Sequence, residues 1–213
     1  MGTPVRVDNA NDGMQLLQSK AAMPDIDQLR RTYAEMSDEE LLQLAVYEAA
    51  DLIPEATEVL REEVCKRGFP DSVGVAIAAQ AHKYTPEEIE LLVARFREAL
   101  CPICAATGRL LNAFRISTVK SCVVVSRREE RLILWCSNCV ERAATKASQV
   151  CVALGWWCFP WGPIYTISAL LLNNKARAAN AFAEPTQEFR EYVLHNPGHV
   201  ALVLKGGLEP TNN

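Results

Sequence analysis

The chain has 213 residues, a formal net charge of −4, and 49% hydrophobic against 23% charged residues. This composition excludes a wholly disordered chain and provides enough apolar material for one or two domains. The charge is uneven, with a net −9 over residues 1–100 and +5 over residues 101–213, so we expect a domain boundary near residue 100.

The first hundred residues predict a polar N-terminal segment followed by a helical module. Residues 1–23 show no sustained hydrophobic period and are expected to be disordered. Residues 24–100 predict an acidic α-helical module of four or five short helices, whose acidic faces are expected to be solvated surface. Two capping boxes, at Ser37–Glu40 and Thr85–Glu88, mark helix starts. Pro54 suits the first turn of a helix, and Gly68 suits a left-handed end to it.

Two Cys-x-x-Cys pairs are the most specific motif in the chain. Cys101-Pro-Ile-Cys104 and Cys136-Ser-Asn-Cys139 are separated by 31 residues. Each pair can present two thiolates from one turn, and together they complete the tetrahedral all-sulfur shell of a structural zinc ion. Such a shell leaves no coordination position for a substrate, so the sequence predicts zinc as a structural cofactor.

Two other uses of these cysteines are open. A redox dithiol of thioredoxin type should follow a strand and open a helix, whereas Cys101 follows a helical run. Disulfides need an oxidising compartment, but no apolar signal segment precedes the polar start, so cytoplasmic, reduced thiols are expected. The remaining cysteines are expected to be small buried hydrophobes, with Cys122 or Cys158 as an alternative ligand. They are Cys65, Cys122, Cys151 and Cys158.

The segment between the pairs predicts β-structure. Residues 109–125 and 131–135 are rich in Val, Ile and Leu, and the charged residues 126–130 are expected to form the turn of a hairpin or three-stranded ribbon. Six basic side chains here are candidate nucleic-acid contacts, although they equally balance the −2 charge of a four-thiolate zinc centre, and no aromatic residues alternate with them. They are Arg109, Arg115, Lys120, Arg127, Arg128 and Arg131.

Residues 147–174 contain no Asp, Glu, Lys or Arg. Two prolines and two glycines within residues 155–163 argue against one straight membrane-spanning helix, because an interior proline costs about 3 kcal/mol. We therefore expect a helical hairpin with arms at residues 148–154 and 164–172, preceded by a helical segment from residue 138. Its turn is either a wedge entering one membrane leaflet or the interior of a domain or partner interface. The contact candidates are Trp156, Trp157, Phe159, Trp161 and Tyr165.

The order Cys-Pro-x-Cys, β-rich spacer, Cys-x-x-Cys and Gly-Trp-Trp-x-Phe-Pro-Trp-Gly-Pro-Ile-Tyr-Thr resembles a group of uncharacterised bacterial zinc-ribbon proteins. The resemblance covers about a third of the chain, and at the position of Cys158 that group often has glycine. It implies a zinc ribbon and no established activity. The matching residues are Cys101, Pro102, Cys104, Cys136, Cys139, Gly155, Trp156, Trp157, Pro160, Trp161, Gly162 and Asn173.

No catalytic constellation is found in the sequence. His195 and His199 are expected to be exposed turn residues before a short strand at residues 200–204. Cys65 beside Lys66 lies at a helix C-terminus, whose dipole disfavours a thiolate. An enzyme with an open zinc position is the least favoured class.

These observations predict an α+β protein: a helical N-terminal module (24–100), then a four-cysteine zinc ribbon with a β-hairpin and an apolar helical hairpin (101–182), and an α-rich C-terminal tail (183–213). The expected function is a non-catalytic adaptor in the cytoplasm, with a position at the inner membrane as a variant. A nucleic-acid-binding ribbon is the alternative. No small-molecule substrate is inferred, and the protein partner is not identified.

Overall fold

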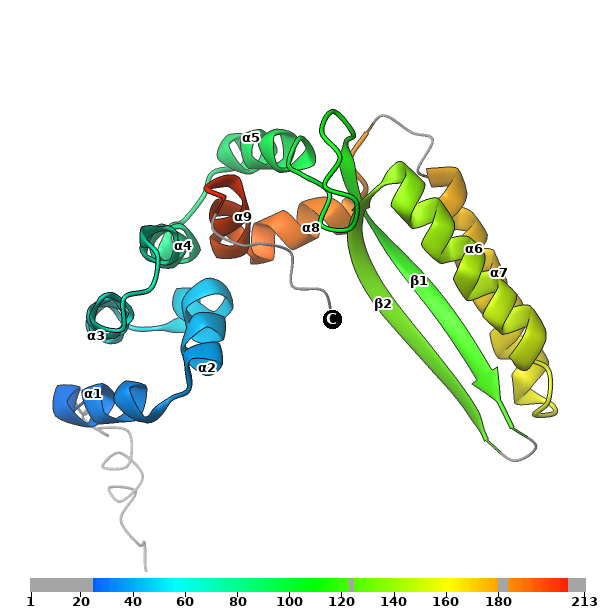
Figure 1. Ribbon diagram of the computed structural model, residues 1–213, viewed down its shortest axis with the longest axis horizontal. Helices are drawn as coiled ribbons and strands as arrows, with labels where there is room; N and C mark the ends of the chain where they lie inside the picture. Colours follow the sequence, from blue (N-terminus) through cyan, green and yellow to red (C-terminus); the bar gives the residue numbers. More distant parts are fainter. Residues whose placement is uncertain (1–24, 123–124, 180–183, 207–213) are drawn as a thin grey trace, which may run out of the picture.

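The computed structural model describes residues 25–122, 125–179 and 184–206; the expectation for residues 1–23 lies outside them. It is helix-rich with one two-stranded antiparallel sheet, which confirms the mixed helical and β character. A row of short helices forms one part of the molecule, and a long arm built of a β-hairpin and two helices projects from it (Figure 1).

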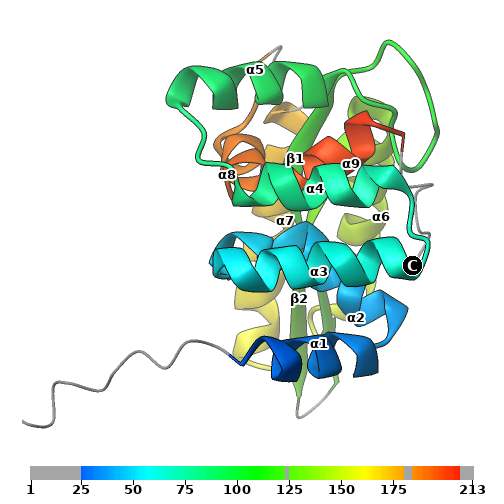
Figure 2. The ribbon, with the colours of Figure 1, turned by 90° about the vertical axis from the view of Figure 1, so that its left-hand side faces the viewer.

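Short helices form the N-terminal half, and most of them lie one above another in a row (Figure 2). The two capping boxes are present as expected. The hydroxyl oxygens of Ser37 and Thr85 accept a hydrogen bond from the backbone amide of the third helical residue, and the carboxylate of that residue accepts one from the backbone amide of Ser37 or Thr85. Pro54 lies in the first turn of its helix, and Gly68 has a φ of +73° just beyond the end. The elements are α1 (Ile26–Glu35), α2 (Asp38–Gln43), η1 (Leu44–Glu48), η2 (Ala49–Asp51), α3 (Pro54–Lys66), α4 (Asp71–Ala81) and α5 (Pro86–Arg97).

The C-terminal segment folds into two helices that belong to the cores of the molecule. These are α8 (Gln187–His195) and α9 (Pro197–Leu204). Leu202 of α9 is fully buried in the core formed by α1 to α4. Phe189 and Val193 of α8 lie in a second core with Phe96 of α5 and the first residues of the sheet. The α-rich character of this segment is therefore confirmed.

The strand expected at residues 200–204 is wrong, because these residues belong to α9. Pro197 occupies the first turn of the helix, and a short apolar run does not distinguish a buried helix from a buried strand. Gly198 allows a close approach: an added Cβ would lie 2.5 Å from the carbonyl oxygen of Val46. The buried carboxamide of Gln80 accepts from the Gly198 amide at 2.8 Å and donates to the carbonyl of Tyr47 at 3.2 Å.

The arm comprises β1 (Leu111–Ser121), β2 (Ser126–Cys136), α6 (Ser137–Leu154) and α7 (Trp161–Ala179). The two strands pair antiparallel from Leu111–Cys136 at the base to Ser121–Ser126 at the tip. The turn expected at residues 126–130 is therefore wrong: these charged residues lie within β2. This strand forms the outer edge of the sheet, where charged side chains oppose pairing with other chains.

A helical hairpin is present, since α6 and α7 pack against each other and against β1, but its arms extend beyond the expected residues 148–154 and 164–172. Within the described ranges, no helix has both the length and the apolar character needed to cross a bilayer. The helices cover β1 so completely that Ile116, Ser117 and Val119 on both of its faces are buried.

Polar side chains of the helices satisfy the outer backbone edge of β1. The carboxamide of Asn173 accepts from the Ser117 amide at 2.9 Å and donates to the Ser117 carbonyl at 2.9 Å, as a neighbouring strand would. The Val119 amide donates to the sulfur of Cys151 at 3.2 Å. Nearer the base, the Thr186 hydroxyl donates to the Ala113 carbonyl. The edge of β1 is therefore closed, which fixes the helices against the strand.

Candidate metal centre

The four cysteines of the two pairs converge at the base of the arm. Their Sγ atoms all lie within 4.8 Å of one another. A tetrahedral zinc with bonds of about 2.3 Å to sulfur requires Sγ–Sγ separations of about 3.8 Å. The Sγ atoms of Cys104 and Cys136 are 3.6 Å apart, so the cluster has the size of a four-thiolate metal shell.

A tight turn presents the first pair. It follows α5, and the amide of Ala105 donates to the carbonyl of Cys101 at 2.8 Å, which closes the turn around Pro102 and Ile103. Ala105 then has a φ of +49°, in the left-handed region that non-glycine residues adopt at a cost of about 1–2 kcal/mol. The chain thus reverses immediately after Cys104, and both sulfurs face the same side.

A strand-to-helix junction presents the second pair. Cys136 is the last residue of β2 and the N-cap of α6, and Cys139 lies in the first turn of that helix. A helix N-terminus stabilises negative charge, which favours thiolates at this place. The Cys136 amide donates to the Cys101 sulfur at 3.5 Å, so backbone hydrogen bonding links the two pairs.

The electrostatics of the cluster favour a cation. Cys101, Cys136 and Cys139 are buried, and Cys104 is exposed. Burial raises the pKa of Cys101, but amide hydrogen bonds led by that of Cys136 outweigh it and lower the pKa to about 7. Burial raises the pKa of Cys139 to about 12, with hydrogen bonds to Cys104 and Cys136 and the charge of neighbouring thiolates adding to the shift. The four side chains would therefore all be thiolates only with a bound metal ion to offset their charge.

The alternative uses of the cysteines fit less well. All eight cysteines are free, so no disulfide forms. The second pair does follow a strand and open a helix, as a redox dithiol would, but its sheet is antiparallel and its sulfurs meet the first pair. The grouping itself favours a metal ligand set.

The other four cysteines divide into two kinds. Cys151 and Cys158 are buried, as expected, and Cys151 receives the Val119 amide described above. The expectation of burial is wrong for Cys65 and Cys122, which are exposed. Cys65 follows the buried Val64, at a position where α3 turns its face toward solvent.

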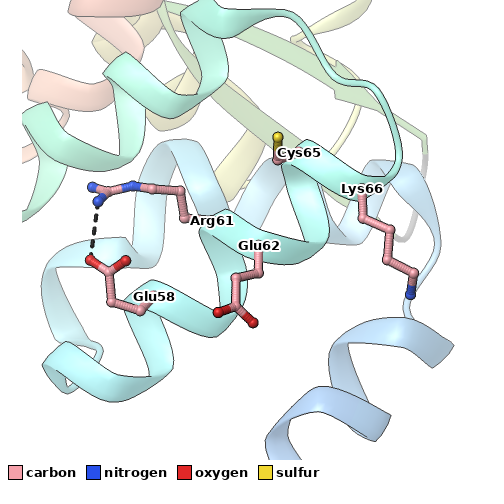
Figure 3. Close-up of a pocket in the computed structure, with 5 residues that line it drawn as sticks. All are labelled: Glu58, Arg61, Glu62, Cys65 and Lys66. Atoms are coloured by element: carbon pink, nitrogen blue, oxygen red, sulfur yellow. Dashed lines mark hydrogen bonds and ion pairs between the residues drawn. The ribbon is translucent and has the colours of Figure 1, made fainter.

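Cys65 lies on the rim of an open depression of about 490 Å³ on α3 (Figure 3). The other lining residues are charged, and Arg61 pairs with Glu58 at 3.0 Å along the same helix. The side chains spread over one solvated helix face, with no histidine among those that line it. This depression therefore offers no arrangement for nucleophilic catalysis.

The two C-terminal histidines lie in different environments. His195 is exposed, with Nδ1 donating to the Glu191 carbonyl at 2.7 Å. His199 is half-buried, which corrects the expectation of an exposed turn residue. Its Nδ1 lies 3.0 Å from the Tyr192 hydroxyl, and its ring stacks on Tyr47 with centroids 5.6 Å apart. Burial lowers the pKa of His199, and His199 belongs to no group of three or more metal-ligating side chains among the described residues.

The basic side chains between the pairs do not form one patch. In the register of the hairpin, Lys120, Arg127 and Arg131 share one face of the sheet, while Arg115 and Arg128 point to the other. Arg109 lies in the loop before β1.

Glutamates of the same strand pair with three of these cations. Arg127 and Arg131 both contact Glu129, at 2.9 and 3.4 Å, and Arg128 pairs with Glu130. Lys120 has no anionic partner among the described residues.

The aromatic residues gather at the far end of the arm, in and beside the turn between α6 and α7. Trp156 and Trp157 are 43% and 66% exposed, Phe159 is 88% exposed and Trp161 is 56% exposed. We call these four residues the aromatic tip. Tyr165 is half-buried and stacks on Trp161, with centroids 6.1 Å apart. The tip is thus surface of this chain and not part of its interior.

Comparison of the chain with models of protein families, with curated proteins and with solved structures gives no significant match.

Proposed function

We propose that this protein is a non-catalytic, zinc-stabilised adaptor whose arm presents the aromatic tip to a partner. The observation that carries the proposal is the position of the cysteine cluster, with one pair in the loop after α5 and the other where β2 meets α6. A metal at this point ties the arm to the helical module, as a structural ion in a zinc ribbon would.

Zinc is the metal we propose, because four sulfur ligands in a tetrahedral set select a soft or borderline ion and favour zinc in a structural site. All four positions are filled by the protein. The metal therefore has no vacancy at which a substrate could bind, which argues for a structural role over an enzymatic one.

A rigid arm suits the presentation of a contact surface at a distance. From Cys136 to Ser126, β2 spans about 34 Å at roughly 3.4 Å per residue. The α6–α7 pair stiffens the hairpin along its length, and Asn173 fastens α7 to β1 midway. The contact residues are thus held well away from the metal and the helical cores.

A nucleic-acid-binding ribbon is less well supported. Three of the six candidate cations pair with glutamates, and the five on the strands are divided between two faces of the hairpin. A gel-shift titration at several salt concentrations tests this alternative, because phosphate contacts weaken steeply with added salt.

The adaptor proposal is tested by site-specific photo-crosslinking in cells. We expect a cross-linker at Phe159 to give discrete adducts, to either protein or lipid, and one at Leu91, which is 55% exposed on α5, to give none of them. The adducts should disappear in a Cys101→Ser/Cys136→Ser protein, because the arm loses its anchor. Equal adducts from both positions, or adducts that persist without the cysteines, would contradict the proposal.

A further inference from the structure

The end of the arm is built from two chain turns that meet, the α6–α7 turn and the end of the β-hairpin. The Ser121 hydroxyl donates to the Gly155 carbonyl at 2.9 Å and lies 2.8 Å from the Ser126 hydroxyl. A pocket of about 180 Å³ between the two turns is lined by Ser126, Cys158, Trp161 and Tyr165. Both turns lie together at the free end of the arm (Figure 1).

This end combines exposed apolar groups with cations. Beside the aromatic tip, Val125 of the hairpin end is 65% exposed. One residue behind the Ser121–Ser126 pair, Lys120 lies directly opposite Arg127 across the hairpin. Directly opposed like charges destabilise a sheet. Glu129 contacts Arg127 at 2.9 Å, whereas Lys120 has no such partner among the described residues, so a further anion at this position would relieve the repulsion.

The whole arm is positively charged, as are Lys120 and Arg127 at its end. Residues 111–179 carry nine Lys and Arg against three Glu, a formal charge of +6, whereas the rest of the chain carries 13 Lys and Arg against 23 Asp and Glu, a formal charge of −10. An anionic surface would attract the arm and repel the helical module. The tip would therefore be directed toward that surface.

We infer that the end of the arm binds the headgroup region of an anionic lipid bilayer. Exposed tryptophans are favoured at the membrane–water interface, where the ring is buried and its N–H remains hydrated. Lys120 and Arg127 lie where lipid phosphates would be, just behind the aromatic tip. The inference rests on the proposed adaptor function and names the partner of its contact surface.

The hairpin limits how deeply the tip enters. Lys120 and Arg127 are only one residue from the Ser121–Ser126 pair, which is level with Gly155 in the helical turn. Deeper entry would carry these charges into the hydrocarbon core, at a cost of several kcal/mol. The contact is therefore a shallow one at the interface, less deep than the wedge entering one membrane leaflet that the sequence allowed.

The test is flotation of the zinc-loaded full-length protein with vesicles of phosphatidylcholine, with and without phosphatidylserine. We expect binding to the vesicles that contain phosphatidylserine, weakened by added salt. Trp157→Ser/Phe159→Ser should reduce binding by about tenfold or more, because both exposed rings are lost. Lys120→Gln and Arg127→Gln should each reduce it about fivefold.

Matched controls use exposed positions on the helical module. Leu91→Ser and Lys83→Gln should bind as the wild type does. Quenching of tryptophan fluorescence by brominated lipids should be strongest for bromines nearest the headgroups. Quenching strongest at the bilayer centre would overturn the shallow placement.

Absence of vesicle binding by metal-loaded protein would overturn the lipid inference. Discrete cross-links at Phe159 to a protein, or self-association that Phe159→Ser abolishes, would then assign the tip to a protein surface and leave the adaptor proposal in place. Failure of the protein to bind zinc would instead remove the adaptor proposal itself.

Discussion

Asn173 shows how one side chain fastens two elements of this protein. Its carboxamide satisfies both backbone groups of Ser117, and both residues are fully buried. Removing the carboxamide would leave an N–H and a C=O without partners in a dry environment. Such groups cost about 1–3 kcal/mol each.

We therefore expect Asn173→Leu to lower the free energy of unfolding by about 2–4 kcal/mol. Urea unfolding of the zinc-loaded protein measures the change. The neighbouring Asn174→Leu is the control, because Asn174 is exposed and should change stability by less than about 0.5 kcal/mol. Equal losses for both variants would contradict the role given to Asn173.

His199 predicts a pH dependence of stability. Burial lowers the pKa of His199, so the folded protein holds the neutral ring and the unfolded chain takes up the proton first on acidification. The stability from the neutral ring is present above the unfolded pKa of about 6.5 and is lost as the pH falls below it toward the lower folded value.

His199→Gln should thus flatten the decrease in the free energy of unfolding between about pH 7.5 and about pH 5.5. The exposed His195→Gln is the control and should keep the wild-type slope. Denaturant unfolding at fixed zinc concentration gives both slopes, and a wild-type slope in His199→Gln would refute the prediction.

At the scale of elements, local sequence signals were sufficient to predict the structure wherever a single turn determines it. The capping boxes, Pro54 and Gly68 act within a few residues of their own position, and the structure has each of them as expected. The helical hairpin followed from its prolines and glycines in the same way. The convergence of the two cysteine pairs was also predictable, because two Cys-x-x-Cys pairs at this spacing are typical of one four-ligand metal site.

The errors fall where tertiary packing determines the structure. Residues 126–130 resemble a turn in composition, yet they form the first part of β2, the uncovered edge strand of the sheet. The run at residues 200–204 is buried as a helix because Gly198 and Gln80 let α9 approach α4. The environments of Cys65, Cys122 and His199 likewise depend on neighbours from distant segments, which no local pattern encodes.

The turn between α6 and α7 needs glycine at position 155. An added Cβ would lie 1.9 Å from the Thr166 Oγ1 and 2.5 Å from the Cys151 carbonyl oxygen. Gly155→Ala should therefore destabilise the arm by about 1–3 kcal/mol. Gly74→Ala in α4 is the control: its Cβ would meet no atom within 4 Å, and alanine stabilises a helix by about 0.5–1 kcal/mol over glycine.

Thermal unfolding of the two alanine variants compares them directly. The midpoint should fall for Gly155→Ala and stay equal or rise for Gly74→Ala. A midpoint unchanged by Gly155→Ala would show that the turn is looser than this packing implies.

On the scale of the whole molecule, the cysteine cluster links a helical module to a long arm. Cys101, Cys136 and Cys139 are part of the core that α5 and α8 also form, so loss of the ion would affect residues on both sides of it. The core of the helical module, around Leu41, Leu60 and Ile77, does not include the cysteines. Metal removal should therefore disorder the core that contains the cysteines, α5 and α8 before the core around Leu41, Leu60 and Ile77.

Zinc should raise the stability of the wild type in a concentration-dependent way, because only the folded chain holds the assembled ligand set. Cys136→Ser should abolish this dependence, while the exposed Cys65→Ser should retain it. Hydrogen exchange after chelation should show amides of α5, α8 and the base of the arm opening first. If the core around Leu41, Leu60 and Ile77 opened as fast as the core with the cysteines, the independent stability of the first core would be contradicted.

X-ray absorption at the zinc edge tests the central claim most directly. The protein purified without added chelator should contain one zinc per chain, surrounded by four sulfur atoms at about 2.3 Å. A protein free of metal, or a shell that includes nitrogen or oxygen ligands, would contradict a closed structural centre formed by Cys101, Cys104, Cys136 and Cys139.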